Sequence, residues 1–155
     1  MSISGKQDNF GTTEPALRLL LNARVGRLAT VNERGRPSVV PICFAVIRDE
    51  EPVVVSVLDE KPKHVPDEEL ARVRNITHNP NVAFVVDHYE EDWSRLAFVQ
   101  VRGQARLVSA GEPGHAEAII ALREKYPQYR SMAIEGRAVI MIDNLRLTAW
   151  SATGE

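Results

Sequence analysis

The stretch "VGRLATVNERGRPSVVPICFAVI", Val25–Ile47, decides the fold of this chain. Two apolar runs rich in β-branched residues flank the polar segment "NERGRP", whose Gly35 and Pro37 are typical turn residues. Two such runs joined by a short turn predict an antiparallel β-hairpin. Pro41 lies inside the second run, and proline cannot donate to a strand ladder. We therefore expect this strand to lie at a sheet edge or to carry a bulge.

Four further segments have strand patterns. "VVVSVL", Val53–Leu58, reads as a strand buried on both faces, and "NPNVAFVVDHY", Asn79–Tyr89, reads as a turn followed by a strand. "SRLAFVQVRGQARLVS", Ser94–Ser109, alternates apolar and polar residues, which predicts a long antiparallel strand with one solvated face. The segment "RAVIMIDNLRLTAW", Arg137–Trp150, is expected to close the chain as two strands around "DN".

Helical patterns occur in "TTEPALRLLLNARV", in "DEELARVRNI" and in "EPGHAEAIIALREKY". The predicted buried stripes are Leu17, Leu20 and Leu21 in the first helix, and Ile119, Leu122 and Tyr126 in the last. The strands follow one another in hairpin order rather than alternating with helices. The expected fold is mainly β, a small antiparallel barrel of six to seven strands with two or three peripheral helices. We expect one domain over residues 1–155, with residues 1–12 flexible.

Composition narrows the functional classes. The 155 residues include 19 Lys and Arg against 21 Asp and Glu, a net charge of -2, which argues against a general nucleic-acid-binding protein. Cys43 is the only cysteine, so neither an intrachain disulfide nor a cysteine zinc site can form. We see no signal peptide and no apolar run long enough to span a bilayer, and we expect a cytoplasmic protein without membrane contact.

Motifs for dedicated catalytic side chains are missing from the sequence. It has no Walker loop, no G-x-G-x-x-G and no G-x-S-x-G. The histidines lack the spacing of a helical zinc pair, and we interpret them as surface or loop residues: His64, His78, His88 and His115. Cys43 lies in an apolar strand and reads as a small core residue. We predict no metal site and no catalytic side chain.

A basic cluster follows the strand Val53–Leu58. Its members are Lys61, Lys63, Arg72 and Arg74. The planar fork of arginine suits a phosphate group, which favours an anion-binding site. A solvated helix with ion pairs to Glu68 and Glu69 is the competing interpretation, and the residues alone leave both open.

The order of these segments resembles the flavin and deazaflavin split β-barrel superfamily, which includes the pyridoxamine 5′-phosphate oxidases. The resemblance runs from about Leu17 to Trp150 and is carried by "GRLATV", "GRPSVVPICF", "VVVSV", "RVRNITHNPNVAFVVD" and "VRGQARLV". The segments "KPK", "DHYEEDW" and "LTAWSA" are similar to a branch of probable coenzyme F420-dependent enzymes.

The resemblance implies a homodimer with two cofactors at the subunit interface. Main-chain groups of two strands would border the cofactor ring: Val39, Pro41, Ile42, Val55, Ser56 and Val57. Arg72, Arg74 and Asn75 match a phosphate-holding R/K-x-R-N pattern, with Lys61 and Lys63 in a longer insertion beside it. Trp93 would approach the ring across the interface, and Trp150 matches a C-terminal aromatic of the branch.

The implied activity is hydride transfer between a deazaflavin, coenzyme F420, and an unidentified small organic substrate. Two alternatives stay open. The first is an oxidase or reductase of the same fold that uses flavin mononucleotide (FMN). The second is a flavin- or haem-binding carrier without turnover, in which His64, His78 or His88 would matter as a ligand.

Overall fold

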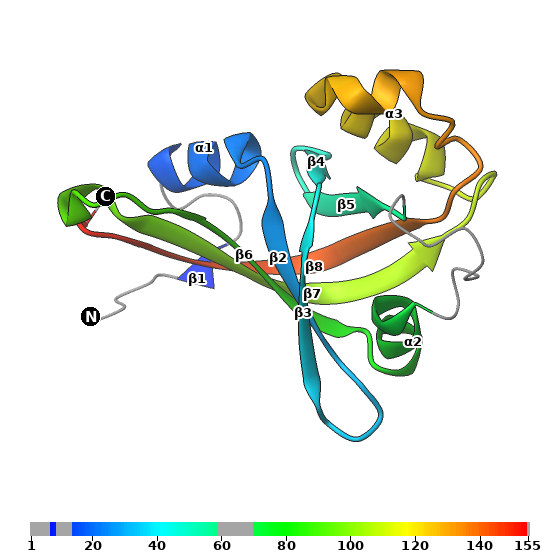
Figure 1. The fold of residues 1–155 in the computed structure, drawn as a ribbon, viewed down its shortest axis with the longest axis horizontal. Helices are drawn as coiled ribbons and strands as arrows, with labels where there is room; N and C mark the ends of the chain where they lie inside the picture. The colour runs from blue at the N-terminus through cyan, green and yellow to red at the C-terminus, as the bar shows by residue number, and fades with distance from the viewer. Residues whose placement is uncertain (1–6, 9–13, 59–69, 155) are drawn as a thin grey trace.

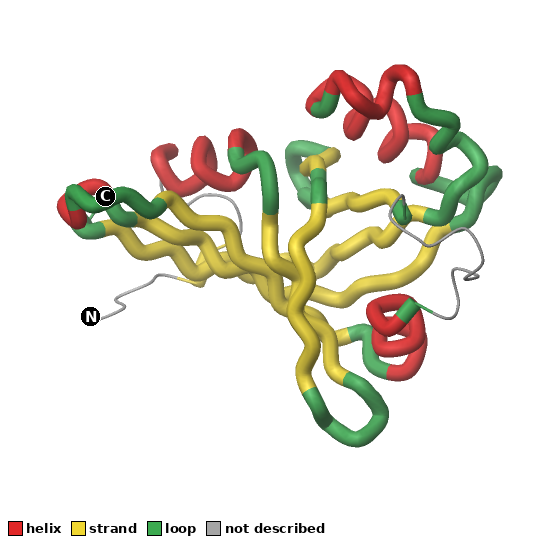
Figure 2. Tube along the Cα trace, in the orientation of Figure 1, coloured by secondary structure: helices red, strands yellow, loops and turns green. Residues whose placement is uncertain are grey.

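The computed structural model describes residues 7–8, 14–58 and 70–154 (Figures 1 and 2). Residues 1–12, expected to be flexible, lie outside the described part except for Gln7 and Asp8. In chain order the elements are β1 (Gln7–Asp8), α1 (Glu14–Asn22), β2 (Gly26–Val31), β3 (Pro37–Ile42), β4 (Ala45–Ile47), β5 (Val53–Val57), α2 (Ala71–His78), β6 (Asn81–His88), the short 3-10 helix η2 (Trp93–Arg95), β7 (Ala97–Val108), α3 (His115–Lys125), the 3-10 helix η3 (Pro127–Ser131) and β8 (Val139–Ser151).

The strands form one antiparallel sheet in the order β3-β2-β6-β7-β8-β5-β4, with β1 paired to β8. The two end strands, β3 and β4, are consecutive in the chain and separated only by Cys43 and Phe44. The sheet therefore curves round until its two edges meet at this junction, as expected of a split β-barrel. The predicted hairpin is confirmed with the register Gly26↔Ile42 to Val31↔Pro37. Because β3 ends the strand order, the edge position predicted from Pro41 is also confirmed.

The helices close the ends of the barrel. Figure 1 shows α1 and α3 above the sheet and α2 below it, beside the projecting β2–β3 hairpin. The stripe predicted for α3 is confirmed, since Ile119, Leu122 and the adjoining Tyr126 are buried. In α1 the prediction for Leu21 is wrong, because its side chain is 43% exposed. The short helix packs through Ala16 and Leu20, which lie four residues apart on one face, and Leu21 falls beside that face.

The segment predicted as two strands around "DN" is a single strand, β8. Asn144 has φ 51°, and the register against β7 shifts between Arg102 and Gln104, which is a β-bulge. A Cβ on Gly103 would lie 2.6 Å from the carbonyl oxygen of Asp143, so only glycine fits opposite the bulge. The bulge accommodates one extra residue of β8 near Asn144, so the strand continues through this segment without a turn.

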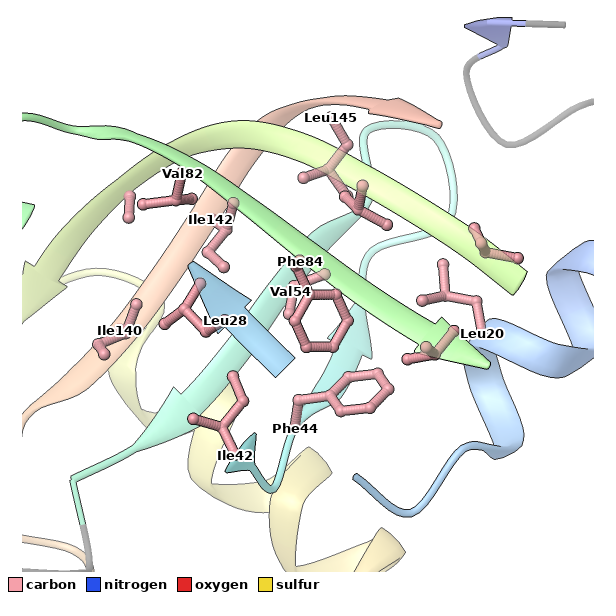
Figure 3. Packing of buried hydrophobic residues seen from close by; sticks show 14 of the residues in the cluster. Leu20, Leu28, Ile42, Phe44, Val54, Val82, Phe84, Ile140, Ile142 and Leu145 are labelled. Carbon is pink, nitrogen blue, oxygen red and sulfur yellow. The ribbon is translucent and has the colours of Figure 1, made fainter. Parts of the chain in front are cut away.

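Large apolar side chains fill the barrel. Phe44 and Phe84 meet edge to face with ring centroids 4.7 Å apart, surrounded by Leu28, Val54 and Ile142 (Figure 3). Each fully buried side chain of this size contributes about 1.5–3 kcal/mol to folding. A second cluster lies between α3 and the strands β4, β5 and β8. Since side chains occupy the interior, ligand sites have to be sought in the outer grooves.

Candidate functional site

A groove of about 730 Å³ lies between the turn of the β2–β3 hairpin and helix α2. Its walls come from two segments that are far apart in the sequence. The lining residues are Asn32, Glu33, Arg34, Arg36, Pro37 and Ser38 on the hairpin side, and Ala71, Val73, Arg74, Asn75, Thr77 and His78 on the helix side. Figure 1 shows the hairpin projecting beside α2, so the groove lies at the α2 end of the barrel.

The hairpin turn has a defined shape. The side-chain oxygen of Asn32 accepts hydrogen bonds of 2.9 Å from the backbone N–H groups of both Arg34 and Arg36. Gly35 has φ 74°, which the turn requires and which glycine adopts without strain. The turn therefore presents two arginines at the rim of the groove. Sequence analysis identified this segment only as a turn, although two arginines flanking a glycine are a visible signal.

Helix α2 carries the described part of the predicted basic cluster. Val73 and Ile76 are buried in the core, Arg74 is exposed, and both Arg74 and the buried Asn75 line the groove. Arg72 is not among the residues that line the groove. Lys61 and Lys63 lie outside the described residues, as does His64. The structure thus brings together Arg74 and Asn75 of the predicted phosphate-binding residues.

The described part of the groove carries an excess of positive charge. Among the described residues, three arginines and His78 line it, against the single carboxylate of Glu33. Within the described ranges neither Arg34 nor Arg36 forms an ion pair, so their guanidinium groups remain available to a ligand. Guanidinium groups bind phosphate and carboxylate through paired, charge-assisted hydrogen bonds. The donor set fits a phosphate-bearing or carboxylate-bearing molecule.

The residues expected to border a cofactor ring lie on β3 before the β3–β4 junction and on β5, which pairs with β4 after it. Val39 is 62% exposed and Pro41 is exposed, whereas Ile42 and all of β5 are buried. The hydroxyl of Ser56 donates a hydrogen bond of 2.8 Å to the carbonyl of Cys43, which ties β5 to the junction. A role of Val55, Ser56 and Val57 in ring binding stays a prediction, and with their side chains buried it would depend on main-chain groups.

Lys125 lies behind this junction and was not singled out from the sequence. Its Nζ atom is 3.7 Å from the centroid of the Phe44 ring, is shielded from solvent and has no hydrogen-bond partner. Burial, assisted by the charge of Arg24, lowers the pKa of Lys125 to about 8. The neighbouring Tyr126 hydroxyl accepts from the Phe44 N–H at 3.0 Å and donates to the Arg24 carbonyl at 2.9 Å. These contacts hold the junction against the end of α3.

The two tryptophans lie at the opposite end of the sheet from the groove. Trp93 is 66% exposed in η2, and Trp150 stacks on Phe98 with ring centroids 5.9 Å apart. Strand β6 leads from α2 to this end over eight residues, a rise of about 25 Å. One chain therefore does not bring the tryptophans to its own groove, and their approach to a cofactor across a subunit interface stays a prediction.

The histidines differ in environment. His78 and His88 are exposed, as interpreted from the sequence. For His115 that interpretation is wrong: the side chain is buried, and its Nε2 lies 2.6 Å from the Arg137 carbonyl oxygen, because the first turn of α3 packs against the start of β8. Over residues 14–58 and 70–154, no group of three or more histidine, cysteine or acidic side chains is arranged to hold a metal ion.

Within residues 14–58 and 70–154, no helix is long and apolar enough to cross a membrane. Cys43 is partly buried and packs against the second core cluster, which agrees with its interpretation as a small core residue.

Comparisons with known proteins identify relatives of this fold. A family model described as pyridoxamine 5′-phosphate oxidase matches residues 12–151. No curated protein matches the sequence. A solved structure of the conserved hypothetical protein Rv2991 from Mycobacterium tuberculosis is 21% identical, with a TM-score of 0.67, and the match covers 91% of this chain and 86% of that one.

Two other similar solved structures carry names that describe different functions. One is named an F420 reductase, with 24% identity, a TM-score of 0.58 and coverage of 85% of this chain and 94% of that one. The other is HutZ, a haem storage protein from Vibrio cholerae, with 16% identity, a TM-score of 0.61 and coverage of 87% and 94%. At these identities the likeness establishes the fold alone.

Proposed function

The chain belongs to the pyridoxamine 5′-phosphate oxidase family, and from that membership we propose that it is an oxidoreductase dependent on coenzyme F420. The reaction would transfer a hydride between the deazaflavin and a small organic substrate. The observation that carries the proposal is the positive groove between α2 and the β2–β3 turn. Its arginines suit the phosphate of the coenzyme and the carboxylates of its tail.

The residues divide into two roles. Arg34, Arg36 and Arg74 would hold the anionic part of the coenzyme in the groove. The exposed main chain of β3 around Val39 and Pro41 would border the ring, and the Ser56–Cys43 hydrogen bond keeps that strand end in place. When bound, the coenzyme supplies the hydride chemistry. This chain contributes binding, orientation and the exclusion of water, which agrees with the missing motifs for catalytic side chains.

We propose further that the protein is a homodimer with the cofactor sites at the interface. The outer face of the sheet supports this proposal. Cross-strand pairing places Val39, Ala29 and Ala83 in one row, and Pro41 and Val85 on either side of Arg27 in the next. The apolar residues form a surface that includes Val39, the most exposed valine of the described residues, and that is bordered by the Arg27–Asp87 ion pair; a second copy would cover it. Trp93 and Trp150 of one subunit could then approach the cofactor of the other.

A paired titration tests the cofactor. Oxidised coenzyme F420, FMN and haem are each added to the purified protein, the first two followed by fluorescence anisotropy and haem by its Soret absorbance. We expect saturable binding of F420 in preference to FMN, because the groove has several cations for a ligand with several anionic groups. Preference for FMN would favour a flavin-dependent enzyme of the same fold, and binding of haem alone would favour a carrier.

A variant pair assigns any binding to the groove. Arg72→Ala/Arg74→Ala removes the two predicted phosphate-binding arginines, and Arg18→Ala removes an exposed arginine on α1 that pairs with Glu14. We expect the double variant to lose F420 affinity by about tenfold or more, and the control to retain it. Equal affinity in both variants would place the coenzyme elsewhere.

A further inference from the structure

A second groove, of about 700 Å³, lies between α1 and the end of the sheet that carries the C-terminus. Figure 1 shows α1 above this end of the sheet, well away from α2. Ala16 and Leu19 line the groove from the helix, and both also pack in the barrel core. The groove therefore has an apolar wall along α1, and it shares no lining residue with the groove at α2.

Cross-strand pairing builds the floor of this α1 groove. His88 of β6 lies opposite Ala97 of β7, and Ala97 lies opposite Ser151 of β8. The next row on the same face pairs Val99 with Ala149. All five residues line the groove. The floor is therefore mainly apolar, with His88 at one end of its outer row and Ser151 at the other.

The imidazole of His88 is oriented by its neighbours. Its Nε2 atom lies 2.6 Å from Oε2 of Glu90, and Oε1 of Glu90 lies 3.3 Å from Nε of Arg95. A carboxylate only accepts hydrogen bonds, so in the neutral ring Nε2 carries the hydrogen and Nδ1 is an acceptor. Among the described residues the ring bonds to Glu90 alone. Nδ1 thus offers one acceptor at the edge of an apolar groove.

The arginines of the α1 groove are already balanced by carboxylates. Arg18 pairs with Glu14 at 3.2 Å, and Arg95 pairs with Glu90. Within the described ranges no other arginine or lysine lines the groove. The groove therefore has no unpaired cation to attract an anion, and its charges fit an uncharged ligand.

We propose that the α1 groove binds a small, uncharged, mainly apolar molecule with a hydroxyl group, and that Nδ1 of His88 accepts the hydrogen bond of that hydroxyl. The apolar residues cover the body of the ligand and the histidine fixes its orientation, as is usual in small-molecule sites. Glu90 is a positioning residue, because it sets which ring nitrogen accepts. The site does not depend on the proposed coenzyme.

Two probes test the site, p-cresol and toluene, which differ by one hydroxyl. Each is titrated into the isotopically labelled full-length protein without coenzyme, at a pH where the nitrogen spectrum of His88 shows a neutral ring. The amide signals of Ala97 and Ala149 give the affinities. We expect saturable binding of both probes, tighter for p-cresol by about threefold to tenfold, the range of one net hydrogen bond. The Nδ1 signal of His88 should shift with p-cresol alone.

Two results of this titration would overturn the proposal. One is equal affinity for the two probes. The other is no saturable response, as expected of a groove covered by the segment before α1 or by a second copy of the chain.

Variants assign the hydrogen bond to His88. His88→Leu should reduce the affinity for p-cresol to that for toluene and leave toluene binding in place. A preference for p-cresol that persists in this variant would overturn the role of His88. Glu90→Ala should weaken p-cresol binding and let the hydrogen exchange between the two ring nitrogens, which their chemical shifts report. Glu91→Ala, an exposed neighbour outside the groove, is the matched control and should change neither property. An unchanged tautomer and affinity in the Glu90 variant would overturn its positioning role.

Discussion

The side-chain amide of Asn75 donates a hydrogen bond of 2.9 Å to the hydroxyl of Thr30, and both side chains are buried. Asn75 belongs to α2 and Thr30 to β2, 45 residues earlier in the chain. The bond therefore joins the two elements that form the walls of the positive groove. It also gives Asn75, predicted to bind a cofactor, a structural role that can be measured by itself.

Removal of this hydrogen bond should destabilise the packing of α2 against β2. Asn75→Ala should lower the free energy of unfolding by about 1–3 kcal/mol, because the Thr30 hydroxyl stays buried without its donor. Thr30→Val should have a similar cost, and the double variant should cost clearly less than the sum. Urea unfolding of the four proteins measures the coupling. Strictly additive costs would mean that the two side chains do not depend on each other.

The hairpin turn should contribute to anion binding in the groove. Arg36→Gln should weaken F420 binding by about tenfold, because one guanidinium at the rim is lost while the Asn32 hydrogen bond to the residue 36 backbone N–H remains. Arg18→Gln serves as the matched control. Fluorescence anisotropy gives both dissociation constants, and an Arg36 variant that binds like the control would remove the turn from the site.

Lys125 should make stability depend on pH. Its pKa is lowered from 10.5 to about 8 in the folded protein, so between these values the unfolded chain binds more protons than the folded one. The free energy of unfolding should therefore rise from about pH 8 upwards. Burial raises the pKa of Tyr126, which works in the opposite direction only near and above its ordinary value of 10.

Urea unfolding between pH 7.5 and about 9.5 measures this rise. Lys125→Met keeps an unbranched apolar side chain over Phe44 and should flatten the dependence. Arg130→Met, an exposed arginine on η3, is the comparison variant and should keep it. A rise of equal size in the Lys125 variant would assign the pH dependence to other groups.

The bulge should tolerate no side chain at position 103. Gly103→Ala would place a Cβ 2.6 Å from the Asp143 carbonyl oxygen and 2.8 Å from Ile142. Since backbone must move to relieve this contact, we expect a loss of about 1–3 kcal/mol in the free energy of unfolding. Gly136→Ala is the control, because its Cβ would meet no atom within 4 Å. Equal stability of the two variants in urea would contradict the packing described for the bulge.

The apolar outer face should hold two subunits together. Val39→Glu introduces a charge at a position of that face that is 62% exposed, and we expect the dimer to dissociate in sedimentation equilibrium. Ile120→Glu is the matched control, since Ile120 is 59% exposed on α3, a helix outside this face. A wild-type protein that sediments as a monomer, or an equal effect of both substitutions, would argue against this interface.

The fold could be predicted largely from local patterns. The alternation in Ala97–Val108 and the turn residues between β2 and β3 produced the correct strands, because side-chain direction in a strand repeats every two residues. The bulge in β8 could not be predicted in this way. The polar residues "DN" suggest a turn, and only pairing with β7 along the whole strand keeps β8 continuous.

The site was only partly predictable. Arg72, Arg74 and Asn75 were identified together from a motif, but only Arg74 and Asn75 line the groove. Arg34 and Arg36 were not identified, since nothing local to a turn shows which helix will lie beside it.

What the sequence by itself determined is the mainly β architecture, its hairpin order and the faces that are buried, since all three depend on residues close together in the chain. What only the tertiary structure decided is which polar side chains share a groove. Strand pairing between β2, β6 and β7 brings the turn at Arg34 beside Arg74, and the register of β6, β7 and β8 sets His88 in one row with Ser151. Both arrangements arise from pairing between distant segments, and the energy of that pairing is spread over the whole sheet rather than encoded at either site.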